Sequence, residues 1–109
     1  MKVARVLIIA VFLVTLFGMV SGCTGSGTPN FTVTSSVDNN HSHNAVISGA
    51  DVDNPPAQKT ITSDGANHTH TITLTKQNYE AIKQGQEVTV TSSSNGATPH
   101  THTFTIKKP

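Results

Sequence analysis

The sequence predicts a small, mainly β domain. We expect an antiparallel β-sandwich or barrel-like fold of three repeated hairpins, with pseudo-threefold repetition and one short helix near residues 76–84. Three observations lead to this prediction: a stretch of alternating apolar and polar residues recurs three times, threonine is abundant, and Asn, Gly, Asp and Ser gather in the middle of each repeat. Threonine favours strands, and the other four residue types favour turns.

The three copies of the repeat cover residues 32–48, 60–75 and 89–107. Each copy opens with Thr, then Val or Ile, then Thr-Ser, and each ends in His-x-His followed by alternating apolar residues. We therefore interpret each copy as two antiparallel strands joined by a polar loop. The connector between the first two copies, residues 49–59, contains two adjacent prolines and is expected to be irregular.

The second connector, residues 75–86, has the pattern of a short helix. Thr75 can cap its start, Tyr79 and Ile82 fall on one face, and Gly85 can end it.

The N-terminal segment has the pattern of a signal peptide. Two basic residues precede an apolar stretch, residues 6–20, which is shorter than a typical membrane-spanning helix. The sequence VSGC then follows at residues 20–23 and resembles the lipobox of bacterial lipoproteins. In that family the signal is cleaved before the cysteine, which is then lipid-modified. The resemblance implies a signal peptide at residues 1–22 and a lipidated Cys23.

The rest of the chain is then divided into the lipidated cysteine with a flexible tether, residues 23–30, and a His-x-His repeat β domain, residues 31–109. The lipid would anchor the protein to a membrane of the cell envelope. Because residue 24 is Thr and not Asp, the resemblance favours the outer membrane or cell surface over the inner membrane. The alternative is a secreted protein whose one cysteine is unmodified; that cysteine has no partner for an intramolecular disulfide.

Composition limits the possible functions. After residue 22 the chain has five Lys against six Asp and Glu and no basic patch, so nucleic-acid binding is not expected. Large apolar side chains are few, and the only aromatic residues of this part are Phe31, Tyr79 and Phe104. A core this small often needs a covalent or metal crosslink, and a metal ion is the candidate that remains.

All the histidines of the chain belong to the three His-x-His pairs. Side chains of a strand alternate between its faces, so in the second copy His68 and His70 share a face with Ile72 and Leu74. The histidines thus continue the apolar side of each strand and should converge at the loop end. Neutral imidazole is a common metal ligand, and a bound ion would satisfy the ring nitrogens. The candidate ligands are His41, His43, His68, His70, His100 and His102.

His-x-His on a strand resembles the metal-binding motif of carbonic anhydrases, of cupins and of the iron-binding tips of some phage tail fibres. In those tips, pairs from three chains enclose an octahedral ion, and the resemblance implies that one chain supplies all three pairs here. Two smaller sites, or one site with four of the six histidines, remain open. Four acidic residues are also available, and we interpret them as solvated loop residues. They are Asp38, Asp51, Asp53 and Asp64.

The expected cofactor is a divalent transition metal: Zn or Fe first, with Ni, Co and Cu(II) also compatible with nitrogen ligands. The predicted function is an envelope-anchored lipoprotein whose ion is a structural staple or captured cargo. One alternative is a structural or adhesive surface β domain without a functional metal. The other is a three-His zinc enzyme of hydrolytic or lyase type. Catalysis is not expected, because no Asp or Glu is adjacent to a histidine pair in the sequence and because six histidines would saturate the ion.

Overall fold

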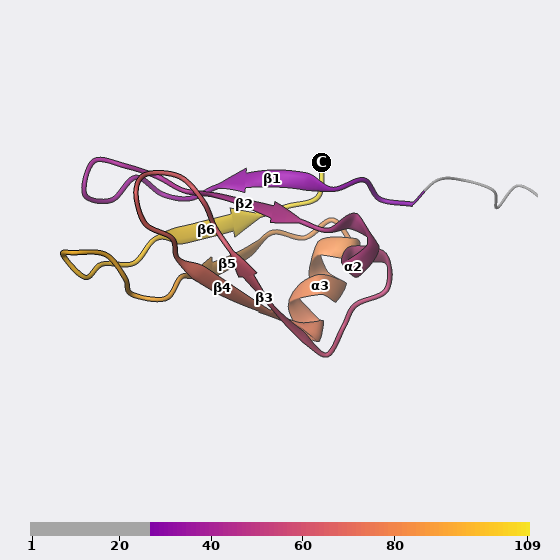
Figure 1. Cartoon of the computed structure of the whole chain (residues 1–109). Coiled ribbons are helices and arrows are strands. Elements are labelled where there is room, and N and C mark those ends of the chain that lie inside the picture. Colours follow the sequence, from indigo (N-terminus) through magenta and orange to yellow (C-terminus); the bar gives the residue numbers. More distant parts are fainter. Residues whose placement is uncertain (1–26) are drawn as a thin grey trace, which may run out of the picture.

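Three antiparallel hairpins extend in one direction in the computed structural model, which describes residues 27–109 (Figure 1). Each hairpin forms its own two-stranded sheet, and the strands of residues 27–109 form no closed barrel. The predicted mainly β fold of three repeated hairpins is confirmed. The paired strands are β1 (Phe31–Thr34) with β2 (Asn44–Ile47), β3 (Gln58–Thr62) with β4 (Thr71–Thr75), and β5 (Val88–Thr91) with β6 (Thr103–Ile106).

Alternation along the strands places one apolar face of each hairpin inside. In β4 the side chains of Ile72 and Leu74 are buried, whereas Thr73 between them is exposed. In β2 the inward residues are Ala45 and Ile47, and Val46 on the other face is 55% exposed. The period of two in the sequence therefore sets which residues reach the core.

The apolar core occupies the half of the described domain that also holds the two helices of residues 27–109 (Figure 1). Tyr79 and Phe104 are its largest side chains, and both are fully buried. The core continues along the strands toward the loops as far as Val33 and Ala45, and beyond these residues histidines occupy the inward positions. The buried apolar residues are Val33, Ala45, Ile47, Val52, Ile72, Leu74, Tyr79, Ile82, Val88, Phe104 and Ile106.

The predicted helix is present as α3 (Lys76–Lys83). The hydroxyl of Thr75 accepts a hydrogen bond from the backbone N–H of Asn78, and the Asn78 side chain accepts one from the backbone N–H of Thr75. This reciprocal capping satisfies N–H groups that the first turn leaves free. Tyr79 and Ile82 are both buried, so α3 covers the open end of the core as the spacing predicts.

The expectation of an irregular connector at residues 49–59 is wrong for its first half, where α2 (Gly49–Asp53) forms a short helix. The Ser48 hydroxyl caps it by accepting a hydrogen bond from the backbone N–H of Asp51. Val52 faces inward and is fully buried. The helix stops before Pro55, because a residue that precedes proline is disfavoured in helical geometry.

The three hairpins are joined to one another in a cycle just below the loops. Ser36 of the first hairpin pairs with Thr103 of the third, since the Ser36 N–H donates to the Thr103 carbonyl at 2.8 Å and the Thr103 N–H donates to the Ser36 hydroxyl at 3.0 Å. Ser93 of the third pairs with Thr71 of the second at the same two distances. The cycle closes where the backbone N–H groups of Asp64 and Asn44 each donate to the other's carbonyl. Every hairpin therefore contacts both others at equivalent positions, which gives the arrangement its pseudo-threefold character, although the third junction has the Asp64 carbonyl in place of a serine hydroxyl.

The ordered domain begins before residue 31. Both the backbone N–H and the hydroxyl of Thr28 donate to the Asp53 carboxylate, at 2.8 and 2.7 Å. The Gly49 N–H donates to the Asn30 side chain at 2.9 Å. Thus the last residues of the predicted tether are held against α2. The predicted signal peptide and Cys23 lie outside the described residues.

Candidate metal centre

The six histidines lie at the loop end of the hairpins, opposite the helices and opposite the point where residue 27 leaves the domain (Figure 1). The second histidine of each pair is the residue just before β2, β4 or β6, so the pair continues the inward face of the strand. His43, His70 and His102 are each 1% exposed and form an inner triangle. The other three, His41, His68 and His100, are partly buried and form an outer triangle nearer the loop tips.

The six rings are arranged as the vertices of an octahedron. Of the fifteen possible ring pairs, twelve have centroids 4.7–5.1 Å apart. An octahedron has twelve edges, and its other three vertex pairs lie opposite each other. Each opposite pair here joins an outer ring of one hairpin with an inner ring of another. The opposite pairs are His41 with His70, His68 with His102, and His100 with His43.

The nitrogen atoms are spaced as ligands of a single ion would be. The Nε2 atoms of His68 and His70 are 3.1 Å apart, and so are those of His41 and His100. In an octahedron the ligand-to-centre distance is the edge divided by √2, so an edge of 3.1 Å corresponds to about 2.2 Å between ligand and ion. The ligand atoms also form two groups of four, each within 4.8 Å of one another, which share His41 and His70 and together contain all six residues. The structure thus shows a cluster that could hold a metal ion.

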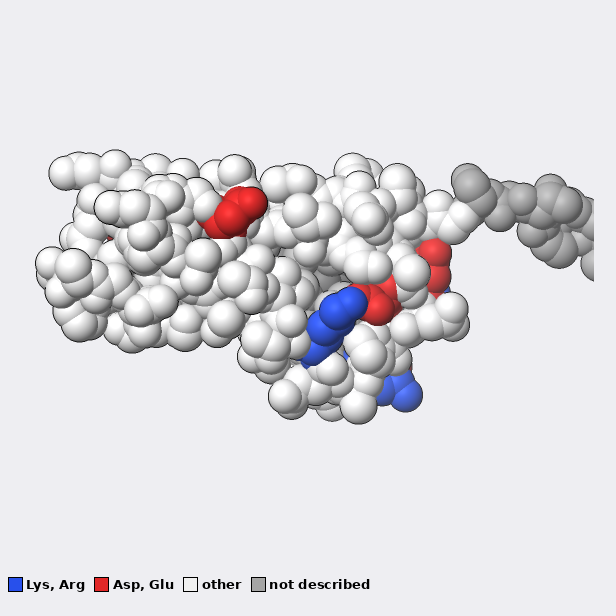
Figure 2. All heavy atoms as spheres, in the orientation of Figure 1, with Lys and Arg blue, Asp and Glu red and all other residues white. Residues whose placement is uncertain are grey.

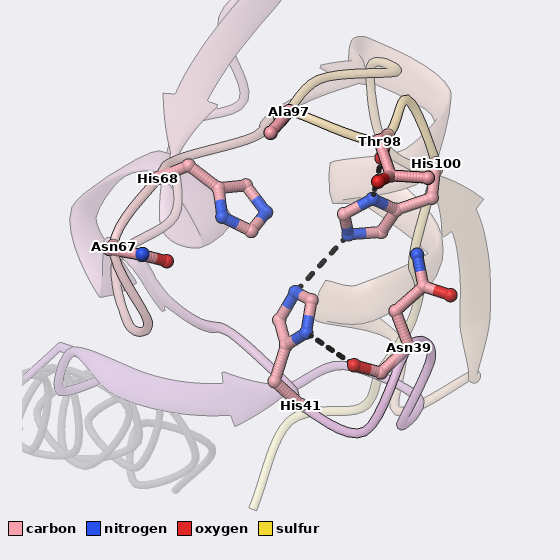
Figure 3. A pocket seen from close by; sticks show the side chains of 7 residues that line it. All are labelled: Asn39, His41, Asn67, His68, Ala97, Thr98 and His100. Carbon is pink, nitrogen blue, oxygen red and sulfur yellow. Dashed lines mark hydrogen bonds between the residues drawn. The ribbon is translucent and has the colours of Figure 1, made fainter.

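Hydrogen bonds on the far side of the rings fix the proton positions. The Nδ1 atom of His41 lies 3.0 Å from the Asn39 carbonyl, and that of His100 lies 2.7 Å from the Thr98 carbonyl (Figure 3). A carbonyl oxygen only accepts, so both rings carry a proton on Nδ1 and, when neutral, have a lone pair on Nε2. These two lone pairs face each other at 3.1 Å. A proton could bridge one such pair, whereas a metal cation at the centre can bind all six nitrogens.

Two inner rings show the same tautomer. His70 Nδ1 lies 2.8 Å from the Ser93 carbonyl, and His102 Nδ1 lies 3.0 Å from the Ser36 carbonyl. The buried Nε2 atoms of His43 and His102 have no hydrogen-bond partner. Leaving a buried polar nitrogen unpaired is costly, and coordination would satisfy each of them.

The serine that closes each Thr-Val/Ile-Thr-Ser stretch supports the inner triangle, a role that the sequence analysis missed. The hydroxyls of Ser35, Ser63 and Ser92 accept hydrogen bonds from the backbone N–H groups of the inner histidines, at 3.0, 3.2 and 2.9 Å. All three serines are buried. The sequence did contain a signal for this role, because a serine follows the first strand in all three repeats. A hydroxyl that is buried in each repeat needs a hydrogen-bond partner in each repeat.

One acidic residue lies closer to the cluster than the sequence suggested. The Asp38 carboxylate is 3.5 Å from His102 Nδ1, although Asp38 belongs to the first hairpin and His102 to the third. Its interpretation as only a solvated loop residue is therefore incomplete. Asp51 and Asp53 lie on α2, where they bind Lys59 and Thr28, far from the histidines.

Burial and crowding act on the charge of the rings. Desolvation lowers the pKa of His43 below its usual 6.5, and the neighbouring His70 and His102 lower it further. Desolvation also lowers the pKa of His68, followed by the effects of His41 and His70. Both shifts favour the neutral imidazole, which is the form that binds a metal.

A pocket of about 340 Å³ opens over the outer triangle (Figure 3). His41, His68 and His100 point toward one another at its base, and loop residues of all three hairpins form its rim. Figure 2 shows basic side chains near the helices and none on the loop end of the face in view. The rim residues are Asn39, Asn67, Ala97 and Thr98.

Comparisons with protein-family models, with curated proteins and with solved structures find no match to this chain. No helix within residues 27–109 combines the length and apolar character needed to cross a membrane.

Proposed function

We propose that this chain binds one divalent transition-metal ion through the Nε2 atoms of its six histidines, and that the ion fastens the three hairpins together. The observation that carries the proposal is the pair of facing Nε2 lone pairs of His41 and His100 at 3.1 Å, in two rings whose protons are held on Nδ1 by carbonyl oxygens. Without a cation these lone pairs repel. With one, the Nε2 atoms of His43 and His102, which have no hydrogen-bond partner within residues 27–109, gain a ligand bond.

A structural role is favoured by where the cluster lies. Its three inner histidines are 1% exposed and occupy the inward positions that the apolar core vacates at the loop end. Each hairpin contributes two ligands, so one ion crosslinks all three. A chain with so few large apolar side chains gains much from such a crosslink, because binding energy for the folded state adds directly to folding free energy.

The geometry favours a six-coordinate ion. Structural zinc sites are almost always tetrahedral, with Zn–N distances of about 2.0–2.1 Å. Six nitrogens about 2.2 Å from a common centre suit Fe(II), Co(II) or Ni(II) better, so we place iron ahead of zinc. Saturation by six imidazoles leaves no open position for substrate, and the proposal assigns no catalytic role.

The proposal includes anchoring through a lipid on Cys23. The support is the VSGC sequence together with the direction of the chain, since residue 27 leaves the domain at the helix end (Figure 1). An anchor at that end would direct the histidine cluster away from the membrane of the envelope.

The test is metal analysis and thermal unfolding of the full-length protein purified in detergent. We expect one equivalent of Fe(II), Co(II) or Ni(II) per chain and a large fall in melting temperature on chelation. A His70→Ala variant should bind the ion more weakly. A histidine outside the cluster cannot serve as the control, because the chain has none. The control is Asn78→Ala, which removes a helix-capping residue and should lower stability without changing metal affinity. Absence of a stoichiometric ion would refute the proposal. A metal-free chain that stays fully folded would instead favour capture of the ion as cargo.

A further inference from the structure

The three outer histidines are not supported equally. The rings of His41 and His100 each have a backbone carbonyl within hydrogen-bond distance of Nδ1, whereas Nδ1 of His68 has no hydrogen-bond partner among residues 27–109 (Figure 3). Such partners orient a ligating ring and raise its basicity, and losing one costs about 10–100-fold in metal affinity. The cluster therefore has one outer ligand whose Nδ1 makes no hydrogen bond, in the described part of the chain, that would orient the ring.

The backbone shows the same difference. The peptide groups of His41 pair with those of Asp38 across the first loop, and those of His100 pair with those of Asn95 across the third. No backbone hydrogen bond is made by His68 within the described part of the chain. Thus both the ring and the main chain of His68 are less restrained than those of its two counterparts.

The ligand opposite His68 is the best supported of the six. His102 Nδ1 lies 3.0 Å from the Ser36 carbonyl, 3.3 Å from the Ser35 hydroxyl and 3.5 Å from the Asp38 carboxylate. Oxygen atoms on that side increase electron donation from Nε2 to an ion. His102 is therefore held on its far side by three oxygen atoms, whereas the ring opposite to it, His68, has none there among the described residues.

His43 also lacks a partner for Nδ1, but it has no room to leave. It is 1% exposed and lies in the inner triangle, whereas His68 borders the pocket of about 340 Å³. Only His68 combines an unsupported ring with adjacent open space.

We propose that His68 is the displaceable ligand of the metal centre, and that a small nitrogen or oxygen donor from solvent reaches the ion through the pocket when His68 swings out. The ion would enter and leave by the same face. This inference rests on the proposed metal-binding function. It adds an exchangeable coordination position and a binding site for a small neutral or anionic donor.

The first test compares the Co(II) affinities of three variants of the full-length protein in detergent: His68→Ala, His41→Ala and His100→Ala. His41 and His100 are matched controls, because they occupy the equivalent outer position in the other hairpins. We expect the loss of Co(II) affinity in His68→Ala to be at least about ten times smaller than the loss in either control variant. Equal losses in the three variants would overturn the inference while leaving metal binding intact, and failure of the wild-type protein to bind Co(II) would overturn both.

The second test follows ligand replacement in the wild-type protein and uses the variants only as spectral references. Azide is titrated into the wild-type Co(II) protein, whose weak six-coordinate absorption spectrum changes when an anionic ligand replaces an imidazole. We expect a saturable change that ends in the adduct spectrum of His68→Ala rather than that of His100→Ala. No spectral change, or a match to His100→Ala, would overturn the inference.

Discussion

Ser63 and His70 are joined by three hydrogen bonds at the base of the histidine cluster. The Ser63 hydroxyl accepts from the His70 N–H at 3.2 Å and donates to the His70 carbonyl at 3.1 Å, and the Ser63 N–H donates to that same carbonyl at 2.8 Å. In the other two hairpins the corresponding hydroxyl donates to the carbonyl of the following residue instead. Ser63 is fully buried, so water cannot replace its hydroxyl.

We therefore predict that Ser63→Ala destabilises the domain by about 1–3 kcal/mol, because the buried His70 N–H loses its acceptor. For a domain of this size each kcal/mol lowers the melting temperature by roughly 4–8 °C. Thermal unfolding followed by circular dichroism measures the change. Ser94→Ala removes a hydroxyl from an exposed loop position and should change the melting temperature little; equal effects of the two substitutions would contradict the assignment.

The second prediction concerns the carboxylate of Asp38. Asp38→Asn removes the negative charge 3.5 Å from His102 Nδ1 and should lower metal affinity by up to about tenfold. Asp51→Asn is the matched control, since Asp51 pairs with Lys59 on the helix half of the molecule. Competition with a fluorescent metal indicator gives both affinities. The role assigned to Asp38 would be wrong if both variants kept the wild-type affinity.

The third prediction concerns the contact between residue 28 and α2. A Cβ atom on Gly49 would lie 1.7 Å from the Thr28 carbonyl oxygen, so Gly49→Ala must displace one segment or the other. We expect a loss of about 3 kcal/mol or more in the free energy of unfolding, measured in urea. Ala50→Ser, at the exposed neighbouring position, should be close to neutral. Wild-type stability of Gly49→Ala would show that residues 27–30 do not pack on α2.

The fourth prediction is a pH dependence located at Asp53. The side-chain and backbone hydrogen bonds from Thr28 hold the pKa of this carboxyl below its usual 3.8. The unfolded chain therefore binds the proton more readily, so the stabilisation is present above about pH 3.8 and is lost as pH falls through the lower folded pKa. We expect the stability difference between wild type and Asp53→Asn to shrink over that interval, measured by urea unfolding in steps from pH 6 to the acid limit. If the difference in the free energy of unfolding did not change with pH, the Asp53 carboxylate would not be the group responsible.

The sequence was sufficient to predict much of the fold because its signals are local. Alternation along β4 and the Thr75 cap of α3 each depend on a few neighbouring residues. The same alternation predicted that the histidines face inward. The helix at Gly49–Asp53 was missed because the two prolines that follow it dominated the pattern, although they lie beyond its end.

The details of the centre depend instead on how the hairpins pack. Nothing in the order of residues indicates that Asp38 approaches His102, or that the ring of His68 lacks the carbonyl partner that the ring of His100 has. Both follow from contacts between segments far apart in the sequence. The choice between one six-ligand cluster and two smaller ones also required the coordinates, because strand alternation gives a direction for each side chain but not a distance between strands.

The cyclic pairing of three hairpins from one chain affects how the six ligand positions can change by mutation. Three identical subunits around an axis can offer only three identical pairs of ligands, so any substitution appears three times at once. Here the hairpins are successive parts of one polypeptide, and each can mutate alone. A single chain thus permits an asymmetric set of ligands, in which one hairpin holds its histidine less firmly than the other two do. A symmetric homotrimer could not encode this difference.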